Sequence, residues 1–325
     1  QIADYLKKKV NTLRQNLQPR KLMEIPGTQE QSASEEWYSQ RFTRLTASKC
    51  KKACNIGKLV CDEASEAAVR AYNFIKSNVW KIDDSGFQSY WMRYGIESEP
   101  HAIKKYEGQT NANVYQTGLW VNPKFPFLAC SPDGLVNDNG LLEIKSLKVF
   151  KNNTVQDITS RTVKISKETE KNQCFSVEDG KCVLRKKHAY YYRMQMQLLV
   201  TEREFCDFIL YAKEGEVSIE RIFRNESLIN EILKYLTAFW FKVLAPEIFE
   251  MRVPRSLNPF ILQDIDMNIT HCQKHDTLER DVEYVSDFDS CKSEYTREEL
   301  NVSGILDNTL KSPIRSPCLS TTDLL

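Results

Sequence analysis

The chain has 325 residues, of which 41% are apolar and 27% charged, so it has the composition of an ordinary globular protein and enough length for one large domain with appendages or for two domains. No run of apolar residues approaches the roughly 18 of a transmembrane helix, so no membrane partner is expected. The net charge is only +1, but it is unevenly distributed, because residues 1–60 carry twelve Lys and Arg against five Asp and Glu, whereas residues 251–325 carry eight against thirteen.

The first third of the chain is predicted to be helical. Apolar residues recur at helical spacing early in residues 1–36, which we interpret as an N-terminal helical flank with a loop at Pro26 and Gly27. Ser34 is a typical helix start. Further helices are expected over about 36–54, 62–77 and 87–107.

The segment after these helices carries the most informative pattern. Short strands are expected near residues 113–121, 125–131 and 141–148. Asp133 follows the second of these strands, and Glu143 and Lys145 lie on the third. Because side chains two apart on a strand share a face, Glu143 and Lys145 should project together, and Asp133 at the end of the neighbouring strand can reach the same point.

Two carboxylates and an ammonium around one point predict a metal-dependent hydrolase of phosphodiester bonds. Oxygen ligands suit Mg²⁺ or Mn²⁺, which bind a substrate phosphate directly and activate a bound water. A neighbouring lysine can orient or deprotonate that water and offset charge on the phosphorus. The plainer interpretation is a surface hairpin with a solvated Glu–Lys pair, since such pairs are common and contribute little to stability.

The rest of the chain continues the mixed pattern of helices and strands. The polar stretch of about 150–186 is interpreted as a long, mobile insertion beside the site, either a lid or a passive loop. Residues 251–325 are acidic and then rich in Ser, Thr and Pro, which predicts a flexible C-terminal tail. The elements expected in between are a helix over about 187–202, strands over about 205–211 and 216–223, and a helix capped by Asn225 that runs to about 244.

Four segments carry a resemblance to a known family. They run in chain order from Trp37 to Ser48, from Tyr94 to Glu99, from Ala129 to Lys145 and from Tyr191 to Thr201. Over about residues 37–223 the sequence resembles the YqaJ-like viral recombinase (phage lambda exonuclease-like) family of the PD-(D/E)xK nucleases. The resemblance implies an α/β fold with a restriction-endonuclease-like core, in which a mixed central β-sheet is flanked by helices. We extend this nuclease domain over residues 37–250.

The resemblance also implies roles for individual residues. The implied catalytic residues are Asp133, Glu143, Lys145, Gln195 and Glu99. The implied ligands of Mg²⁺ (or Mn²⁺) are Asp133, Glu143, the carbonyl of Ile144 and Glu99. Arg41 and Ser48 would contact DNA at a terminal 5′-phosphate. On the residues alone, Arg41 could instead be a solvated helix residue and Ser48 a helix cap, although both residue types contact phosphates routinely.

The sequence departs from the family pattern at Arg193, which stands where the family has a glutamine. We therefore assign the glutamine near the lysine and the attacking water to Gln195 rather than to Gln197, which could equally be an exposed polar residue. Glu97 and Glu99 lie two apart on a helix and cannot share a face, and position in the family pattern selects Glu99.

The combined expectation is a Mg²⁺-dependent deoxyribonuclease, in particular a 5′→3′ exonuclease that acts on duplex ends in recombination or in viral or mobile-element replication. An endonuclease with the same metal site, a catalytically inactive nucleic-acid-binding module and a protein-interaction scaffold remain alternatives. The expected partners are DNA, a homo-oligomer and a single-strand-annealing protein. Ten irregularly spaced cysteines favour reduced thiols and an intracellular location, with the nucleus as one candidate, and no Cys/His group has zinc-finger spacing.

Overall fold

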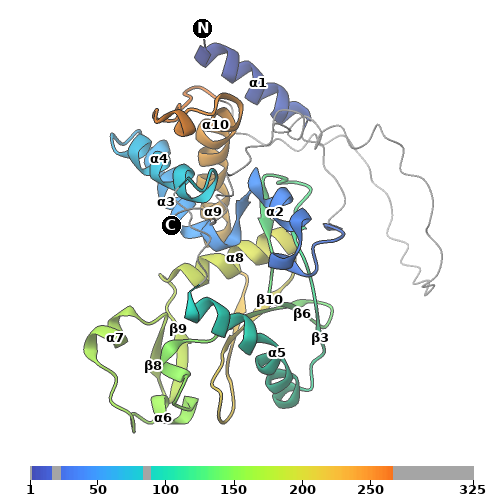
Figure 1. The fold of residues 1–325 in the computed structure, drawn as a ribbon, viewed down its shortest axis with the longest axis vertical. Coiled ribbons are helices and arrows are strands. Elements are labelled where there is room, and N and C mark those ends of the chain that lie inside the picture. Colours follow the sequence, from blue (N-terminus) through green and yellow to red (C-terminus); the bar gives the residue numbers. More distant parts are fainter. Residues whose placement is uncertain (1, 17–22, 83–88, 266–325) are drawn as a thin grey trace, which may run out of the picture. The chain divides into compact units, whose positions relative to one another are not determined.

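The computed structural model describes residues 2–16, 23–82 and 89–265 (Figure 1). The predicted acidic tail lies outside the described residues, except for its first part up to residue 265. Within the described ranges, no helix combines the length and apolarity needed to cross a bilayer. The seven cysteines in these ranges are all free thiols.

Two mixed sheets form the centre of the fold. The larger sheet has the strand order β11 (Ser218–Phe223), β10 (Phe205–Leu210), β7 (Gly140–Lys145), β6 (Gly134–Val136) and β3 (Val114–Tyr115). Its β7 and β10 run parallel, and its other pairs are antiparallel. The smaller sheet has the order β1 (Met23–Glu24), β4 (Trp120–Val121), β5 (Leu128–Cys130) and β2 (Leu45–Thr46), with β2 and β5 parallel. Mixed sheets with flanking helices confirm the predicted α/β class.

Helices cover both faces of the larger sheet. On one face, Ala102 and Tyr106 of α5 (Tyr90–Thr110) pack with Leu142 and Ile144 of β7. On the other face, Leu141 packs in a cluster with residues of α8 (Ala189–Thr201). The alternation of side chains along β7 therefore directs Leu142 and Ile144 toward α5, and Glu143 and Lys145 to the α8 side.

Four further helices gather on the side of α8 away from the larger sheet in Figure 1. They are α3 (Cys50–Cys61), α4 (Ala67–Asn78), α9 (Glu226–Phe239) and α10 (Ala245–Glu250), and a π-helical turn at Trp240–Leu244 joins the last two. Gly57 lets α3 approach α9 closely, because a Cβ there would lie 1.9 Å from the carbonyl oxygen of Tyr235. The predicted N-terminal flank contains α1 (Ile2–Asn16), which packs against α10.

The helix predicted over 36–54 is wrong as a single element. The structure has α2 (Glu35–Phe42), which Ser34 caps as predicted by accepting from the Trp37 N–H, and then a break before α3. Within the break, β2 pairs with β5, and a 3-10 turn at Ala47–Lys49 follows. Tertiary pairing of Leu45 and Thr46 thus overrides helix propensity at this point, and it places Ser48 in the turn between two elements.

The expectation that strands 125–131 and 141–148 are neighbours is also wrong. The strand β5 belongs to the smaller sheet, and the partner of β7 is the short β6. The expected strand over 113–121 likewise divides into β3 and β4, one in each sheet. Asp133 therefore lies in the link between the two sheets, where its N–H donates to the Leu142 carbonyl at 3.1 Å, and it still reaches β7.

The stretch 150–186, expected to be a mobile insertion, carries ordered elements. They are a 3-10 turn (Lys148–Phe150), α6 (Val155–Thr159), α7 (Lys167–Asn172) and a hairpin of β8 (Phe175–Glu178) and β9 (Lys181–Leu184). Phe150 and Phe175 stack with ring centroids 5.6 Å apart and belong to the same buried cluster as Leu141 and residues of α8. The polar composition of this stretch obscures the few apolar residues that attach it to the core.

Candidate active site

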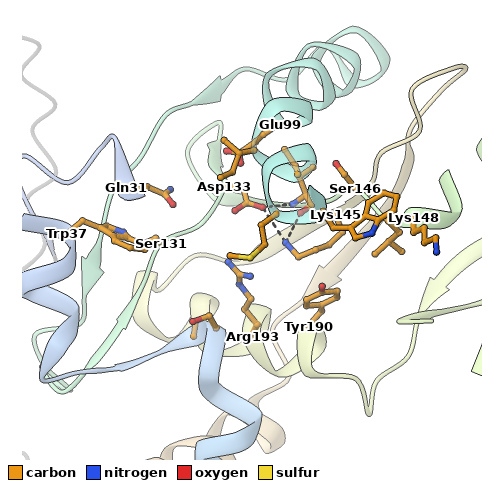
Figure 2. A pocket seen from close by; sticks show the side chains of 18 of the residues that line it. Gln31, Trp37, Glu99, Ser131, Asp133, Lys145, Ser146, Lys148, Tyr190 and Arg193 are labelled. Atoms are coloured by element: carbon orange, nitrogen blue, oxygen red, sulfur yellow. Dashed lines mark hydrogen bonds and ion pairs between the residues drawn. The ribbon is translucent and has the colours of Figure 1, made fainter. Parts of the chain in front are cut away.

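Glu143 and Lys145 lie side by side on β7, as the period of a strand requires. The Nζ of Lys145 is 2.5 Å from Oε1 of Glu143, which is fully buried. The same ammonium donates to the carbonyl of Ile144 at 2.6 Å and lies 3.7 Å from Oδ2 of Asp133 (Figure 2). The oxygen atoms of three residues thus surround a single positive charge.

Contacts from the N-terminal region fix the turn that carries Asp133. Oδ2 of Asp133 accepts from the Ile144 N–H at 2.7 Å, which ties the carboxylate to β7. Gln31 donates to the Pro132 carbonyl at 2.9 Å, and the Trp37 indole donates to Oγ of Ser131 at 2.8 Å. Burial, followed by the negative charge of Glu143, raises the pKa of Asp133.

Two residues one helical turn apart on α8 complete the surroundings of Glu143. Nη1 of Arg193 is 3.0 Å from Oε1 of Glu143, and Nε2 of Gln197 donates to Oε2 at 2.8 Å. Burial disfavours the ionised form of Glu143, but the charges of Arg193 and Lys145 outweigh it and lower the pKa of Glu143. Sequence reasoning noticed Arg193 only as a departure from the family pattern and did not place it at the carboxylate.

The expectation that Gln195 lies beside Lys145 is wrong, and the glutamine that reaches the cluster is Gln197, through Glu143. Gln195 is buried on the opposite face of α8, where it donates to the Phe223 carbonyl at 2.9 Å and accepts from the Asn225 N–H at 2.8 Å. Residues two apart on a helix point about 200° from each other, so only one of the two glutamines can face β7. Gln195 instead holds the junction of β11 and α9.

Glu99 faces the same cluster from α5. It lines the pocket that contains Asp133 and Lys145, and Figure 2 shows it beside Asp133. Glu97 is exposed, so of the two glutamates only Glu99 is placed to act here. Burial, and then the charge of Asp133, raise the pKa of Glu99 to about 7.

Arg41 and Ser48 line the same pocket, which has a volume of about 660 Å³. The guanidinium of Arg41 is 3.7 Å from the centroid of the Trp37 ring. Burial, and then the nearby charge of Arg193, lower the pKa of Arg41 to about 10. Ser48 is exposed, and its hydroxyl lies 3.1 Å from that of Thr46, so it does not cap α3, whose N-cap is Lys49.

The donor atoms at this point are of the chemical type that a hard divalent cation prefers. In the part of the chain that the structure describes, no three His, Cys, Asp or Glu side chains converge closely enough to hold a metal ion, because the oxygens converge on Lys145 instead. The available donors are carboxylate and carbonyl oxygens, which suit Mg²⁺ or Mn²⁺ rather than zinc. Among described residues, the buried Gln197 Oε1 and Ser146 Oγ have no hydrogen-bond partner. Both atoms could therefore form hydrogen bonds with the water molecules of a hydrated ion beside the cluster.

Glu99 gives this site a testable pH dependence. Below pH 7 its carboxyl is largely neutral, and a cation bound beside it would favour the ionised form, so metal affinity should rise as the pH increases through about 7. We expect Mg²⁺ binding near pH 7 to release protons from the wild-type chain and fewer from Glu99→Gln. Calorimetry in two buffers of different ionisation enthalpy measures this. Equal proton release by both proteins would show that Glu99 does not face the ion.

The central strand β7 of a mixed sheet carries Glu143 and Lys145, and Asp133 reaches the same point from the link between the two sheets. Asp133 and Lys145 line a pocket together with Arg41 and Arg193, and this arrangement is that of the PD-(D/E)xK class. The model of the YqaJ-like viral recombinase domain matches residues 36–204, more than half of the chain. The chain belongs to this family, which confirms the resemblance seen in the sequence.

Several solved structures are similar to this chain. The alkaline exonuclease LHK-Exo from Laribacter hongkongensis is 27% identical with a TM-score of 0.47, over 69% of this chain and 98% of its own. LHK-Exo in complex with dAMP gives 0.48 at the same identity and coverage. A phage-related exonuclease from Haemophilus somnus 129PT is 16% identical with a TM-score of 0.40, over 64% of this chain and 96% of its own. Among proteins of curated function, none matches the sequence.

Proposed function

We propose that this chain is a Mg²⁺- or Mn²⁺-dependent deoxyribonuclease that degrades duplex DNA from its 5′ ends. The observation that carries the proposal is the convergence of Asp133, Glu143 and the Ile144 carbonyl on the ammonium group of Lys145. Lys145 lines a pocket together with Arg41 and Arg193. Membership of the viral recombinase family supports a role in recombination or mobile-element replication. A homo-oligomer, a strand-annealing partner and a nuclear location stay predictions from the sequence.

The residues divide the work of phosphodiester hydrolysis between them. Asp133, Glu143 and the Ile144 carbonyl would hold the ion, with Glu99 beside them. When bound, the ion supplies a polarised phosphoryl oxygen and a more acidic water. Lys145 is held as an ammonium by Glu143 and Asp133, whose charges outweigh burial and raise the pKa of Lys145, so it donates hydrogen bonds to the water or to the phosphate and offsets the charge that develops there.

The two arginines suit a phosphate group with two negative charges. Arg193 lies near enough to Arg41 for its charge to lower the pKa of Arg41, and an anion between two such groups relieves their repulsion. Ser48 lines the same pocket and adds a hydroxyl donor. A terminal 5′-phosphate has the double charge that this pair would recognise, and its recognition would set the polarity of digestion.

Loss of Arg41 should therefore remove the preference for phosphorylated ends. We expect the wild-type chain to degrade 5′-phosphorylated duplex faster than the hydroxyl form, and Arg41→Ala to degrade both slowly and at similar rates, because a charged hydrogen bond to phosphate is worth about 1.5–3 kcal/mol, or roughly 10- to 150-fold. Rates on the two substrates are compared with those of Arg70→Ala, an exposed arginine on α4. A preference that persists in Arg41→Ala would contradict this role.

An exonuclease differs from an endonuclease in its need for an end. The proposal predicts that linear duplex is degraded and that a covalently closed circle of the same sequence is not. Linear duplex labelled at one 5′ terminus should release labelled mononucleotide at the earliest times, whereas a 3′ label should appear late. Cleavage of the circle would show that the same metal site acts as an endonuclease and would contradict the exonuclease proposal.

One observation favours a second candidate, a nucleic-acid-binding module without catalysis. Arg193 and Lys145 already neutralise Glu143, and Arg193 stands where the family has a neutral glutamine. If these cations exclude the metal, the wild-type chain will not bind Mn²⁺ in calorimetry, and Arg193→Gln will restore binding. Mn²⁺ binding by the wild-type chain would remove this candidate.

A further inference from the structure

A buried polar network outside the active site joins α5 to the larger sheet. The hydroxyl of Tyr106 on α5 donates to Oδ2 of Asp207 on β10 at 2.5 Å, and both side chains are buried. Arg221 on β11 donates to the same carboxylate twice, from Nε at 2.8 Å and from Nη2 at 2.9 Å. Burial, and then the hydrogen bond to Asp207, raise the pKa of Tyr106, so its hydroxyl keeps its proton and donates. We call Tyr106, Asp207 and Arg221 the α5 anchor.

Stability alone does not explain a carboxylate at this place in the sheet. The strand register puts Asp207 opposite Leu142 of β7, and Leu142 and Ile209 belong to the same buried apolar cluster as Tyr106. Removal of a carboxylate from water costs free energy, and apolar replacements of a buried ion pair are often as stable or more stable. Apolar packing, however, accepts several arrangements of two elements, whereas a hydrogen-bonded network favours one. The α5 anchor therefore suits a role in fixing where α5 lies.

The α5 anchor and the active site share one face of α5. Glu99, Ala102 and Tyr106 are three and four residues apart, which places them on the same side of the helix. Ala102 and Tyr106 are buried against the sheet, and Glu99 lines the catalytic pocket together with Asp133. Seven residues of helix separate Glu99 from Tyr106, a length of about 10 Å. A slide or rotation of α5 on the sheet would therefore carry Glu99 away from Asp133.

Other polar side chains of α5 reach the main chain of the β10–β11 hairpin. The Nζ of Lys105 donates to three carbonyl oxygens of the turn that joins these strands, and Gln109 exchanges two hydrogen bonds with the main chain of Val217. The long side chain of Lys105 is flexible and can follow a small shift of the helix, whereas the Tyr106 ring has only two side-chain torsions. The α5 anchor is thus the more exacting of these attachments.

We propose that Tyr106, Asp207 and Arg221 are positioning residues, which fix the place of α5 on the sheet and thereby hold Glu99 at the metal site. The proposal rests on the proposed function, because Glu99 acts in hydrolysis only if this site binds a metal. None of the three residues lines the catalytic pocket, so their effect on the reaction passes through α5. Loss of the α5 anchor should therefore slow turnover even in a chain that is as stable as the wild type.

An apolar anchor separates positioning from stability. In the triple variant Tyr106→Phe/Asp207→Leu/Arg221→Met, apolar groups of similar size replace the network, so the Tm should stay near that of the wild-type chain. We expect kcat on labelled duplex in Mg²⁺ to fall about 10- to 10²-fold, because a displacement of about 1 Å caused far from the chemistry can cost this much, whereas KM should change little. Tyr106→Phe alone keeps the pairing of Asp207 with Arg221 and should show a smaller fall.

Glu247→Gln is the matched control, because Glu247 is another buried carboxylate with hydrogen-bond donors around it. It lies on α10, where its Oε1 accepts from the Trp80 indole at 3.1 Å and from the Val253 N–H at 2.8 Å. This change should lower the Tm and leave kcat unaltered. Wild-type kcat in the triple variant would overturn the proposal, as would a fall in kcat of equal size in Glu247→Gln.

A spectroscopic measurement tests the position of α5 without metal or DNA. Trp91 lies on α5 eight residues before Glu99, so fluorotryptophan there reports the surroundings of this helix by ¹⁹F NMR, with Trp91→Phe to assign the signal. In EDTA the wild-type chain and Glu247→Gln should give the same single Trp91 resonance, and the triple variant a shifted, split or broadened one. An unchanged resonance in the triple variant would overturn the proposal. If the resonance changes as expected but the wild-type chain never hydrolyses DNA, the role of the α5 anchor stands and the proposed function is refuted.

Discussion

Replacement of Glu143 by glutamine is expected to reduce the rate of DNA hydrolysis by about 10³-fold or more, because electrostatic and metal-ion stabilisation contributes several kcal/mol to such reactions and each 1.36 kcal/mol is a factor of ten. Glutamine keeps the size of the side chain but removes the charge. In the wild-type chain that charge faces Lys145, Arg193 and Gln197. The loss should appear in kcat on end-labelled duplex, together with a weaker response to Mg²⁺.

The same variant should also be less stable without metal. Two cations that Glu143 now neutralises would lose their partner in a buried setting, which costs about 3–5 kcal/mol. A lower Tm with an unchanged circular dichroism spectrum is the expected signature. Glu97→Gln, an exposed change on α5, is the matched control and should leave both rate and Tm unaltered. Full activity of Glu143→Gln would exclude this carboxylate from the site.

Replacement of Lys145 by methionine is expected to lower kcat by about 10²- to 10⁴-fold, the usual contribution of a positioned acid, base or charge-stabilising group. Methionine preserves the apolar length of the side chain but cannot donate to water or phosphate. The effect should fall on kcat more than on DNA affinity, because Arg41 and Arg193 still line the pocket.

The metal response of Lys145→Met separates catalysis from folding. Without the ammonium, Glu143 and Asp133 lose a competing cation, so Mn²⁺ should bind at least as tightly as to the wild-type chain while hydrolysis stays slow. Lys181→Met, an exposed change on β9, serves as the control. A variant that loses Mn²⁺ binding along with activity would indicate that Lys145 holds the site together rather than taking part in the reaction.

Regular periodicity made parts of the fold and site predictable from the sequence. The period of two along a strand predicted that Glu143 and Lys145 share a face, and they lie 2.5 Å apart. The strand predicted over 205–211 is β10, and the helix predicted over 187–202 is α8. These elements combine clear apolar patterning with turn or cap residues at their ends.

Tertiary pairing explains the errors. Nothing local in Leu45 and Thr46 reveals that they pair with β5, which breaks the predicted helix and creates the turn that carries Ser48. The apolar pattern of a single strand also cannot predict that the chain passes from one sheet to the other at Asp133. Such choices depend on residues about 80 positions away, as in the pairing of Leu45 with Leu128.

The glutamine was misassigned for a different reason. Gln195 and Gln197 are both fully buried, so neither burial nor propensity separates them. Arg193 held the missing signal, because a half-buried arginine four residues before Gln197 shares its helix face and favours a carboxylate partner. Glu143, already predicted to be catalytic, was the natural carboxylate partner for Arg193. This pairing would have placed Arg193 and Gln197 together on the face of α8 toward Glu143 and Gln195 on the opposite face.

The central claim is that the cluster of Asp133, Glu143 and Lys145 hydrolyses DNA with a divalent metal. The most direct measurement follows mononucleotide release from 5′-labelled, 5′-phosphorylated linear duplex, with Mg²⁺ or with EDTA, by the wild-type chain and Glu143→Gln. The account predicts rapid release that requires both the metal and Glu143. Release in EDTA, release by Glu143→Gln at the wild-type rate, or DNA binding without any release in Mg²⁺ or Mn²⁺ would contradict it.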